Sequence, residues 1–288
     1  MPDLAAVHPA LAPGATAVIT GAASGIGLAA ATRFAQAGLN VVMADLPGEA
    51  LGAAQAAVAQ TAARPAGVLA VPTDVSSFEA VEDLRAMAQR VFGAPSVLMN
   101  NAGTGLNPGG AAQNLPGWKR LIDVNFWGVA HGVHAFVPGM IASGRPGLVI
   151  NTGSKQGITT PPGNAAYNVS KAGVKVLTEQ LAHELRNTDG AQVTAHLLIP
   201  GFVFTGMTAR GREKPPAAWT PDQTIDFMLH SLGEGAFYIL CPDNDVDRAT
   251  DVKRIRWAAG DIAENRPALS RWHPDWKAKF EAYMASEG

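Results

Sequence analysis

The chain has 288 residues, of which 47% are hydrophobic and only 16% are charged. This length and composition favour one large domain with a buried core over two small domains, and they argue against long disordered stretches. The formal net charge is −2 and Lys and Arg form no cluster, which argues against nucleic acid as a partner. Cys241 is the only cysteine, so neither an intramolecular disulfide nor a cysteine-based metal site can form.

The chain shows no sign of a targeting or membrane segment. Residues 1–14 contain Asp3, His8 and three prolines, and they lack the basic and apolar regions of a signal peptide. The most apolar stretch, residues 128–142, is interrupted by two histidines and a proline and is too short to span a bilayer. We therefore expect a cytoplasmic protein that does not contact membranes.

Short apolar runs alternate along the chain with longer Ala-rich segments that have helical spacing. The runs lie at residues 16–20, 40–44, 68–71, 97–100, 148–151, 193–199 and 237–240. Their continuous rather than alternating hydrophobicity is typical of strands covered on both faces, as in a parallel sheet. The pattern predicts a single α/β domain with a doubly wound, Rossmann-like sheet of seven parallel strands.

Local signals mark where some of the intervening helices begin. Ser76 and Glu79 have the spacing of a capping box and predict the start of a helix over residues 78–92. Thr220 and Gln223 give a similar start to a later helix.

A glycine-rich turn, Thr20-Gly21-Ala22-Ala23-Ser24-Gly25-Ile26-Gly27, follows the first predicted strand and precedes a helix. Glycines permit a tight turn and a close approach of the backbone to a pyrophosphate, and the start of the helix offers N–H groups to the phosphates. Any sharp strand-to-helix turn can use glycine, but the position after the first strand favours a dinucleotide site.

Asp45 ends the second predicted strand, 18 residues after Gly27. A carboxylate there can accept hydrogen bonds from both adenosine ribose hydroxyls and repels a 2′-phosphate. Ser24 and Leu46 stand where an Arg or Lys could bind that phosphate. The sequence therefore favours NAD over NADP as the cofactor, although Asp45 could also be a solvated turn residue before Pro47.

Ser154, Tyr167 and Lys171 give the sharpest chemical signal. Tyr167 and Lys171 are four residues apart, so on a helix their side chains lie on one face. A nearby ammonium group lowers the pKa of a tyrosine, so Tyr167 could act as a general acid/base near neutral pH. Ser154, after the fifth predicted strand, could hydrogen-bond a substrate oxygen as charge develops on it. In isolation, a Tyr–Lys pair at this spacing is usually an exposed surface pair without a function, and such a Ser is usually a turn residue.

Six motifs occur along the chain in a fixed order. They are residues 20–27, Asn100-Asn101-Ala102-Gly103, Asn125, Ser154, Tyr167 with Lys171, and Pro200-Gly201 with Thr205. In their order and separations, including 13 residues from Ser154 to Tyr167, they resemble the short-chain dehydrogenase/reductase family. The resemblance extends over about residues 16–205, some two thirds of the chain.

The resemblance implies roles for individual residues. The implied catalytic residues are Asn125, Ser154, Tyr167 and Lys171. Asn125 would kink its helix and hold a water that passes protons to Lys171, while Tyr167 exchanges the hydroxyl proton during hydride transfer. The implied cofactor-binding residues are Gly21, Ser24, Gly25, Ile26, Gly27, Asp45, Asp74, Val75, Asn101, Ala102, Gly103, Tyr167, Lys171, Pro200, Gly201, Val203 and Thr205.

The segment over residues 202–219 contains Gly206 and Gly211 and suits a mobile lid over the substrate. The predicted substrate-pocket residues are Gln156, Phe202, Phe204, Met207 and Trp219. The apolar character of the last four indicates a hydrophobic or aromatic substrate, although such residues can also be ordinary packing.

The chain continues for 48 residues beyond Leu240, where many members of the family end soon after the seventh strand. Residues 247–265 predict an amphipathic helix with an apolar stripe. The stripe consists of Val252, Ile255, Ala259 and Ile262. The extension could cover a neighbouring subunit or the active site, but we favour packing on its own domain.

We divide the chain into an N-terminal arm (1–14), a dinucleotide-binding and catalytic domain that includes the lid (15–241), and a C-terminal extension (242–288). The expected function is NAD-dependent interconversion of a secondary alcohol and a ketone, in a homodimer or homotetramer, without a metal. The alternatives are an NADP-dependent reductase of the same family and an NAD-binding sensor without turnover.

Overall fold

The structure is a computed structural model that describes residues 3–209 and 213–286, and it confirms the Rossmann-like α/β fold. Its strands are all parallel and form one sheet in the order β3-β2-β1-β4-β5-β6-β7. They are β1 (Thr16–Thr20), β2 (Asn40–Asp45), β3 (Val68–Pro72), β4 (Val97–Asn100), β5 (Gly147–Thr152), β6 (Val193–Ile199) and β7 (Tyr238–Leu240). The strand order reverses between β1 and β4, which places a crevice at their carboxyl ends.

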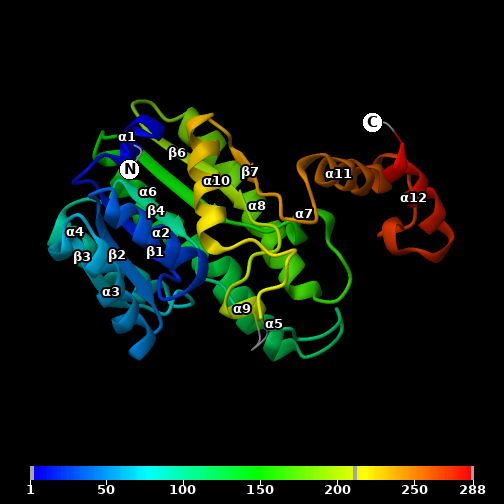
Figure 1. The fold of residues 1–288 in the computed structure, drawn as a ribbon, viewed down its shortest axis with the longest axis horizontal. Helices are drawn as coiled ribbons and strands as arrows, with labels where there is room; N and C mark the ends of the chain where they lie inside the picture. Colours follow the sequence, from blue (N-terminus) through cyan, green and yellow to red (C-terminus); the bar gives the residue numbers. More distant parts are fainter. Residues whose placement is uncertain (1–2, 210–212, 287–288) are drawn as a thin grey trace.

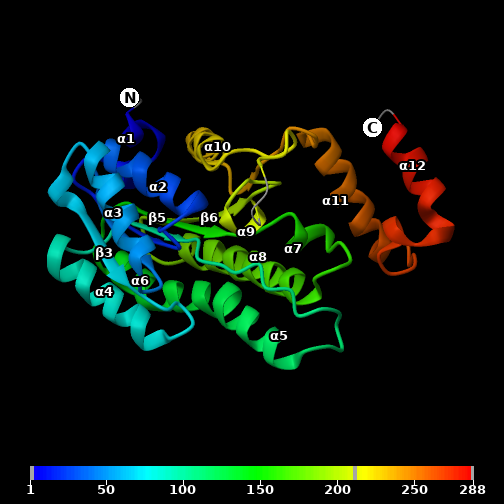
Figure 2. The same ribbon diagram turned by 60° about the horizontal axis from the view of Figure 1, so that its bottom comes forward.

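Helices cover both faces of the sheet (Figures 1 and 2). One layer contains α2 (Gly25–Gln36), α3 (Glu49–Thr61) and α10 (Pro221–Gly233), and the other contains α4 (Phe78–Phe92), α6 (Gly128–Ala142) and α8 (Ala165–Arg186). The shorter helices are α1 (Leu4–Val7), α5 (Leu115–Ile122), α7 (Gln156–Thr159) and α9 (Gly206–Ala209). No helix in the described part of the chain is both long and apolar enough to cross a membrane.

The sheet has a separate apolar core on each face because successive strand residues point in opposite directions. Val18, Val42 and Leu98 lie opposite one another on adjacent strands and pack under α4 and α6. The residues that follow them, including Ile19 and Met43, pack under α2 and α3 instead. All of these side chains are fully buried, which explains why the strands read as continuous apolar runs.

The helix starts agree with the sequence at one predicted position and differ at the other. Thr220 and Gln223 form the expected capping box at the start of α10. The predicted cap of α4 is wrong by one residue, because Ser77 accepts the backbone N–H bond. Ser76 instead donates its hydroxyl to the Asp74 carboxylate, with an Oγ–Oδ1 distance of 2.7 Å. A neighbouring acceptor in the preceding turn therefore draws Ser76 away from the helix.

The C-terminal extension stands out to one side of the sheet (Figures 1 and 2). It contains α11 (Arg248–Ala263), two short 3₁₀ turns and α12 (Lys277–Ala285). The start of α11 packs against α7, whereas α12 buries no residue. The extension thus contacts its own domain through one end only, which is less than the full packing that we favoured from the sequence.

The predicted apolar stripe of α11 is only partly correct, because Ile255 packs against the apolar core whereas Ile262 is 88% exposed. The buried side of the helix carries Asp251 and Trp257. Trp257 packs against Phe280 and Tyr283 of α12, with ring centroids 5.3 and 5.1 Å apart. The helix therefore contacts the core of the domain through Ile255 and the aromatic residues later in the chain through Trp257.

Candidate active site

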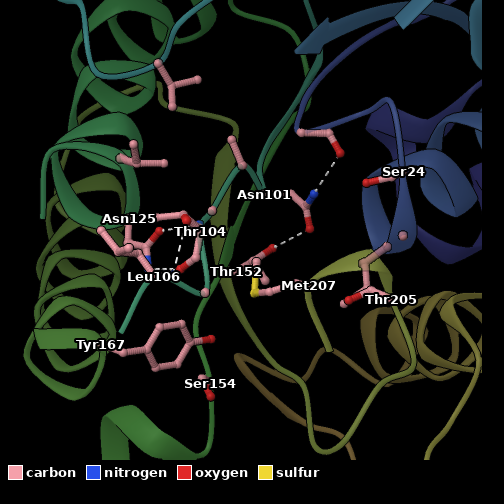
Figure 3. Close-up of a pocket in the computed structure, with 18 of the residues that line it drawn as sticks. Ser24, Asn101, Thr104, Leu106, Asn125, Thr152, Ser154, Tyr167, Thr205 and Met207 are labelled. Carbon is pink, nitrogen blue, oxygen red and sulfur yellow. Dashed lines mark hydrogen bonds between the residues drawn. The ribbon is translucent and has the colours of Figure 1, made fainter. Parts of the chain in front are cut away.

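A cavity of about 810 Å³ opens at the carboxyl ends of the central strands (Figure 3). It lies at the crevice that the reversed strand order creates, where α/β proteins bind their ligands. The predicted site residues that line it are Gly21, Ser24, Gly25, Ile26, Asp45, Asp74, Val75, Asn101, Ala102, Gly103, Asn125, Ser154, Tyr167, Lys171, Pro200, Gly201, Val203, Thr205 and Met207. The fold therefore brings segments from most of the length of the chain into one cavity.

The glycine-rich turn between β1 and α2 has the shape of a phosphate cradle. Gly21 and Gly25 have φ values of +67° and +54°, which glycine adopts readily and other residues rarely adopt. Gly27 lies behind the cavity wall, and a Cβ there would collide with the carbonyl oxygen of Gly21. Ser24 caps α2 without a side-chain hydrogen bond, so the first turn of the helix keeps its N–H groups directed at the cavity. These features fit the diphosphate of a dinucleotide.

Asp45 lies beside this turn at the end of β2. Its Oδ2 accepts a hydrogen bond from the backbone N–H of Ala23 at 2.9 Å, and its Oδ1 accepts one from Leu46 at 2.8 Å. Among the described residues, the cationic side chains that line the cavity are Arg120 on α5 and Lys171 on α8. The part of the wall formed by β1 and β2 therefore carries a carboxylate and no cation.

Asn101 connects the ends of the central strands. Its Nδ2 donates to the carbonyl oxygen of Thr20 at 3.1 Å, and its backbone N–H donates to the Thr20 hydroxyl at 3.0 Å. The Thr152 hydroxyl donates to Asn101 Oδ1 at 3.4 Å. One side chain thus links β1, β4 and β5, as expected for a residue that braces the fourth strand.

Asp74 and Val75 follow the end of β3 and line the cavity there. The Asp74 carboxylate is held by the N–H and hydroxyl groups of Ser76. Val75 packs against Gly128, where an added Cβ would come within 2.7 Å of its side chain. The close approach of α6 therefore fixes the position of Val75.

Asn125 lies in a π-helical turn (Asp123–Trp127) that joins α5 to α6, so the helix departs from regular α geometry at this residue. The side chain is fully buried, and both of its polar atoms bind the backbone of Thr104. Asn125 Oδ1 accepts from the Thr104 N–H at 2.7 Å, and Nδ2 donates to the Thr104 oxygen at 3.1 Å. Its direct partner is therefore a backbone segment, and its role in holding a water stays a prediction.

Ser154 and Tyr167 lie next to each other at the cavity (Figure 3), and Lys171 lines the same cavity. Asn164 caps α8 by accepting the Tyr167 N–H at 3.1 Å, which fixes the first turn of the helix. Lys171 follows one turn later on the same face, with its Nζ 5.8 Å from the centroid of the Tyr167 ring. The Lys171 Nζ also donates to the carbonyl oxygen of Thr152 at 2.8 Å.

Burial controls the protonation of this pair. It raises the pKa of the Tyr167 hydroxyl, and hydrogen bonding with Ser154 opposes that rise only in part. Burial also lowers the pKa of the Lys171 ammonium group to about 8. The predicted fall in the Tyr167 pKa is therefore wrong for the chain alone, because removal of both groups from water outweighs the effect of the nearby ammonium.

The predicted substrate pocket is only partly present. Met207 lines the cavity, whereas the other four predicted residues do not. Those four are Gln156, Phe202, Phe204 and Trp219. Trp219 instead packs against Phe227 with ring centroids 5.7 Å apart, and Phe202 is 38% exposed. Apolar side chains in a loop can serve packing as well as binding, and the sequence alone does not separate the two uses. Residues 210–212 of the predicted lid lie outside the described residues.

The cavity wall contains residues that sequence reasoning missed, namely Thr104, Gly105 and Leu106. Gly105 faces Met207 so closely that a Cβ would come within 2.7 Å of the Met207 Cγ. These residues follow Asn101-Ala102-Gly103 directly, and this continuation of a site motif was the signal that could have identified them.

The described geometry agrees with comparisons to known proteins. The family model for short chain dehydrogenases matches residues 15–216. The 1-deoxy-11-beta-hydroxypentalenate dehydrogenase of Streptomyces avermitilis is 38% identical over 236 residues, which cover 78% of this chain and 83% of the relative. The 2,5-dichloro-2,5-cyclohexadiene-1,4-diol dehydrogenase LinX of Sphingobium indicum is 34% identical over 222 residues, which cover 77% and 84%.

A solved structure shows the same likeness in three dimensions. It is a short chain dehydrogenase/reductase from Burkholderia phymatum in complex with NAD, with a TM-score of 0.78 and 32% identity. The match covers 88% of this chain and 96% of that one. The chain belongs to the short-chain dehydrogenase/reductase family. It is an oxidoreductase of that family that acts on CH–OH groups.

Proposed function

We propose that the enzyme interconverts a hydrophobic, ring-containing secondary alcohol and the corresponding ketone, with NAD(H) as cofactor. The observation that carries the proposal is the placement of Ser154, Tyr167 and Lys171 in one cavity with the glycine-rich cradle of residues 20–27. A hydride transfer needs a proton donor or acceptor beside the place where the cofactor binds. This cavity combines such a group with a cradle that fits the cofactor.

In this proposal the residues of the cradle hold the cofactor. The turn at Gly21 and Gly25 and the start of α2 bind the diphosphate, and Asp45 accepts the adenosine ribose hydroxyls. When bound, the nicotinamide supplies or accepts the hydride. Thr205 supports the same assembly, because a Cβ at Gly25 would come within 3.0 Å of its side chain, so the two segments meet across the cavity.

Tyr167 is the proposed general acid/base. Its raised pKa keeps the hydroxyl protonated at neutral pH, so it can donate a proton to a carbonyl oxygen during reduction. In the oxidation direction Tyr167 must first lose this proton, and the tyrosinate then accepts the proton of the substrate hydroxyl. Ser154 lies next to it and orients the same substrate oxygen. Lys171 provides a positive charge that favours the tyrosinate when the proton has left.

Asn125 supports the pair from behind. A Cβ at Gly103 would lie 3.4 Å from Asn125 Oδ1 and 3.9 Å from Lys171 Nζ, so both side chains border the same backbone segment. By fixing Thr104, Asn125 holds the segment that continues into the proposed substrate wall.

The proposed substrate class rests on the cavity wall and on the relatives. Leu106 and Met207 give the cavity apolar side chains on the side of Tyr167. The two relatives described above are named for alcohols built on carbon rings. A ring-containing alcohol buries apolar surface against such a wall while its hydroxyl points to Ser154 and Tyr167.

The proposed function is tested by two measurements on the purified enzyme. Fluorescence titration with NADH and with NADPH reports cofactor binding, and we expect NADH to bind more tightly. A panel of cyclic secondary alcohols and ketones, followed by nicotinamide absorbance, reports turnover. Tighter binding of NADPH contradicts the cofactor assignment, and NADH binding without turnover of any panel member contradicts the substrate class.

A further inference from the structure

Three charged side chains form a buried ion cluster next to the catalytic loop, which is the segment that carries Ser154 at the end of β5. The cluster consists of Lys155, Asp243 and Asp251, whose side chains are 17%, 8% and 6% exposed. The Lys155 Nζ lies 2.6 Å from the Asp251 Oδ2 and 3.4 Å from the Asp243 Oδ2. One buried cation thus holds two carboxylates that come from separate parts of the chain.

Each member of the buried ion cluster belongs to a different element around the site. Lys155 follows Ser154 directly and is the residue from which α7 begins. Asp243 follows β7, and Asp251 lies in the first turn of α11. The cluster therefore ties the catalytic loop to the C-terminal extension.

The cluster also contacts the turn at Gly201 and Phe202, which follows β6 and forms a second wall of the cavity. Asp243 Oδ2 accepts a hydrogen bond from the backbone N–H of Phe202 at 3.2 Å. A Cβ at Gly201 would come within 2.7 Å of Asp243 Oδ2 and 2.9 Å of Lys155 Nζ, so the two charged groups press against this turn. Pro200 and Gly201 line the cavity, as Ser154 does. The cluster therefore contacts the turn after β6 through Lys155 and Asp243, whereas Asp251 reaches this turn only through Lys155.

A buried cluster of this kind defines geometry more than it adds stability. The cost of removing charges from water cancels much of their attraction, so the net contribution to folding is small. Removing one partner, in contrast, leaves a buried charge without compensation and forces the surrounding segments to move. The elements that meet at Lys155 are thereby held in one arrangement.

We infer that Lys155, Asp243 and Asp251 act as positioning residues, which fix Ser154 and the Gly201–Phe202 turn relative to each other and make the start of α11 a support of the active site. The inference rests on the proposed function, because Ser154 is the group whose placement matters for turnover. A small displacement of a reacting group lowers the rate of the chemical step far more than it lowers cofactor affinity.

The first test compares Asp251→Asn with Lys277→Met in the full-length enzyme. Asp251→Asn keeps the shape of the side chain and removes its charge, and we expect kcat to fall about 10-fold with a much smaller loss of NADH affinity. Lys277 forms an exposed pair with Glu281 on α12 at 3.9 Å, so its replacement controls for loss of a surface charge. A kcat for Asp251→Asn equal to that of the control overturns the inference.

A second pair of variants separates positioning from simple loss of stability. Lys155→Arg keeps the cation and Lys155→Met removes it, so we expect Lys155→Arg to retain more of the wild-type kcat than Lys155→Met. Equal loss of kcat in both variants contradicts a role for the charge itself.

Amide hydrogen exchange tests the inference without turnover. In Asp251→Asn we expect faster exchange both in residues 154–159 and at the Phe202 N–H, which the cluster restrains. Faster exchange confined to α11 overturns the inference. If the wild-type enzyme turns over no substrate, the proposed function fails, whereas the exchange measurement still decides whether the cluster restrains both walls.

Discussion

The two sides of the cavity are built by different means. On the cofactor side, the contacts come mainly from backbone geometry: the turn at Gly21 and Gly25, the close packing at Gly27 and the strand links made by Asn101. On the catalytic side, Tyr167 and its neighbours act through side-chain groups whose protonation depends on burial. The comparison indicates that changes on the first side should affect binding, and changes on the second should affect turnover.

The largest expected effect separates the two sides most cleanly. Tyr167→Phe removes the proton donor and should lower kcat by roughly 10³-fold, since a general acid/base contributes on the order of 10²–10⁴. The ring stays in place, so NADH affinity by fluorescence titration should be unchanged. Turnover at the wild-type rate would falsify the assignment of Tyr167.

The complementary change lies on the cofactor side. Gly27→Ala places a Cβ against the Gly21 carbonyl oxygen and should weaken NADH binding by roughly 100-fold, because the cradle has to shift. Gly52→Ala on α3 is the matched control, since a Cβ there meets no atom within 4 Å. The control should bind NADH normally and gain about 0.5–1 kcal/mol of stability, because Ala is the better helix former. Equal binding by both variants contradicts the cradle.

Replacement of Lys171 should change both the turnover and the stability of the enzyme. Because its pKa in the folded chain is about 8 against an ordinary value of 10.5, folding disfavours the charged form at neutral pH. Lys171→Met should therefore abolish turnover while stabilising the cofactor-free enzyme by about 2 kcal/mol at pH 7, after subtraction of the lost hydrogen bond to Thr152.

The pH dependence of this gain has a defined sign. Below about pH 8 both the folded and the unfolded chain carry the charge, so the penalty is complete. As the pH rises from about 8 to 10.5, the folded chain loses the proton first, and the penalty disappears. Urea unfolding of both proteins should show a difference that is largest at pH 7 and shrinks above pH 8. A difference that stays constant over this range contradicts the assigned pKa.

The smallest expected effect concerns cofactor choice. Asp45→Ala removes the carboxylate that disfavours a 2′-phosphate, so the preference for NADH over NADPH should narrow by about 10-fold. The ratio of the two dissociation constants from titration measures this directly. An unchanged ratio shows that Asp45 serves only to hold the Ala23 N–H.

The sequence by itself determined the sheet and most of the residues around the cavity. Continuous apolar runs identified all seven strands, because both faces of the sheet are buried. The glycines of the cradle could be predicted because the backbone there leaves no space for a side chain. The pairing of Tyr167 with Lys171 could be predicted because residues four apart lie on one face of a helix. Such requirements act between residues that are only a few positions apart, so a short stretch of sequence is enough to recognise them.

Only the tertiary structure decided which side chains face the cavity, how their pKa values shift, and where the extension lies. Trp219 and Met207 are both apolar residues of one segment, yet only Met207 reaches the cavity. Lys155 and Asp251 are separated by 96 residues, and nothing local marks them as a pair. Burial and long-range pairing depend on every element that packs around a residue, so they are properties of the folded chain and not of any short stretch of sequence.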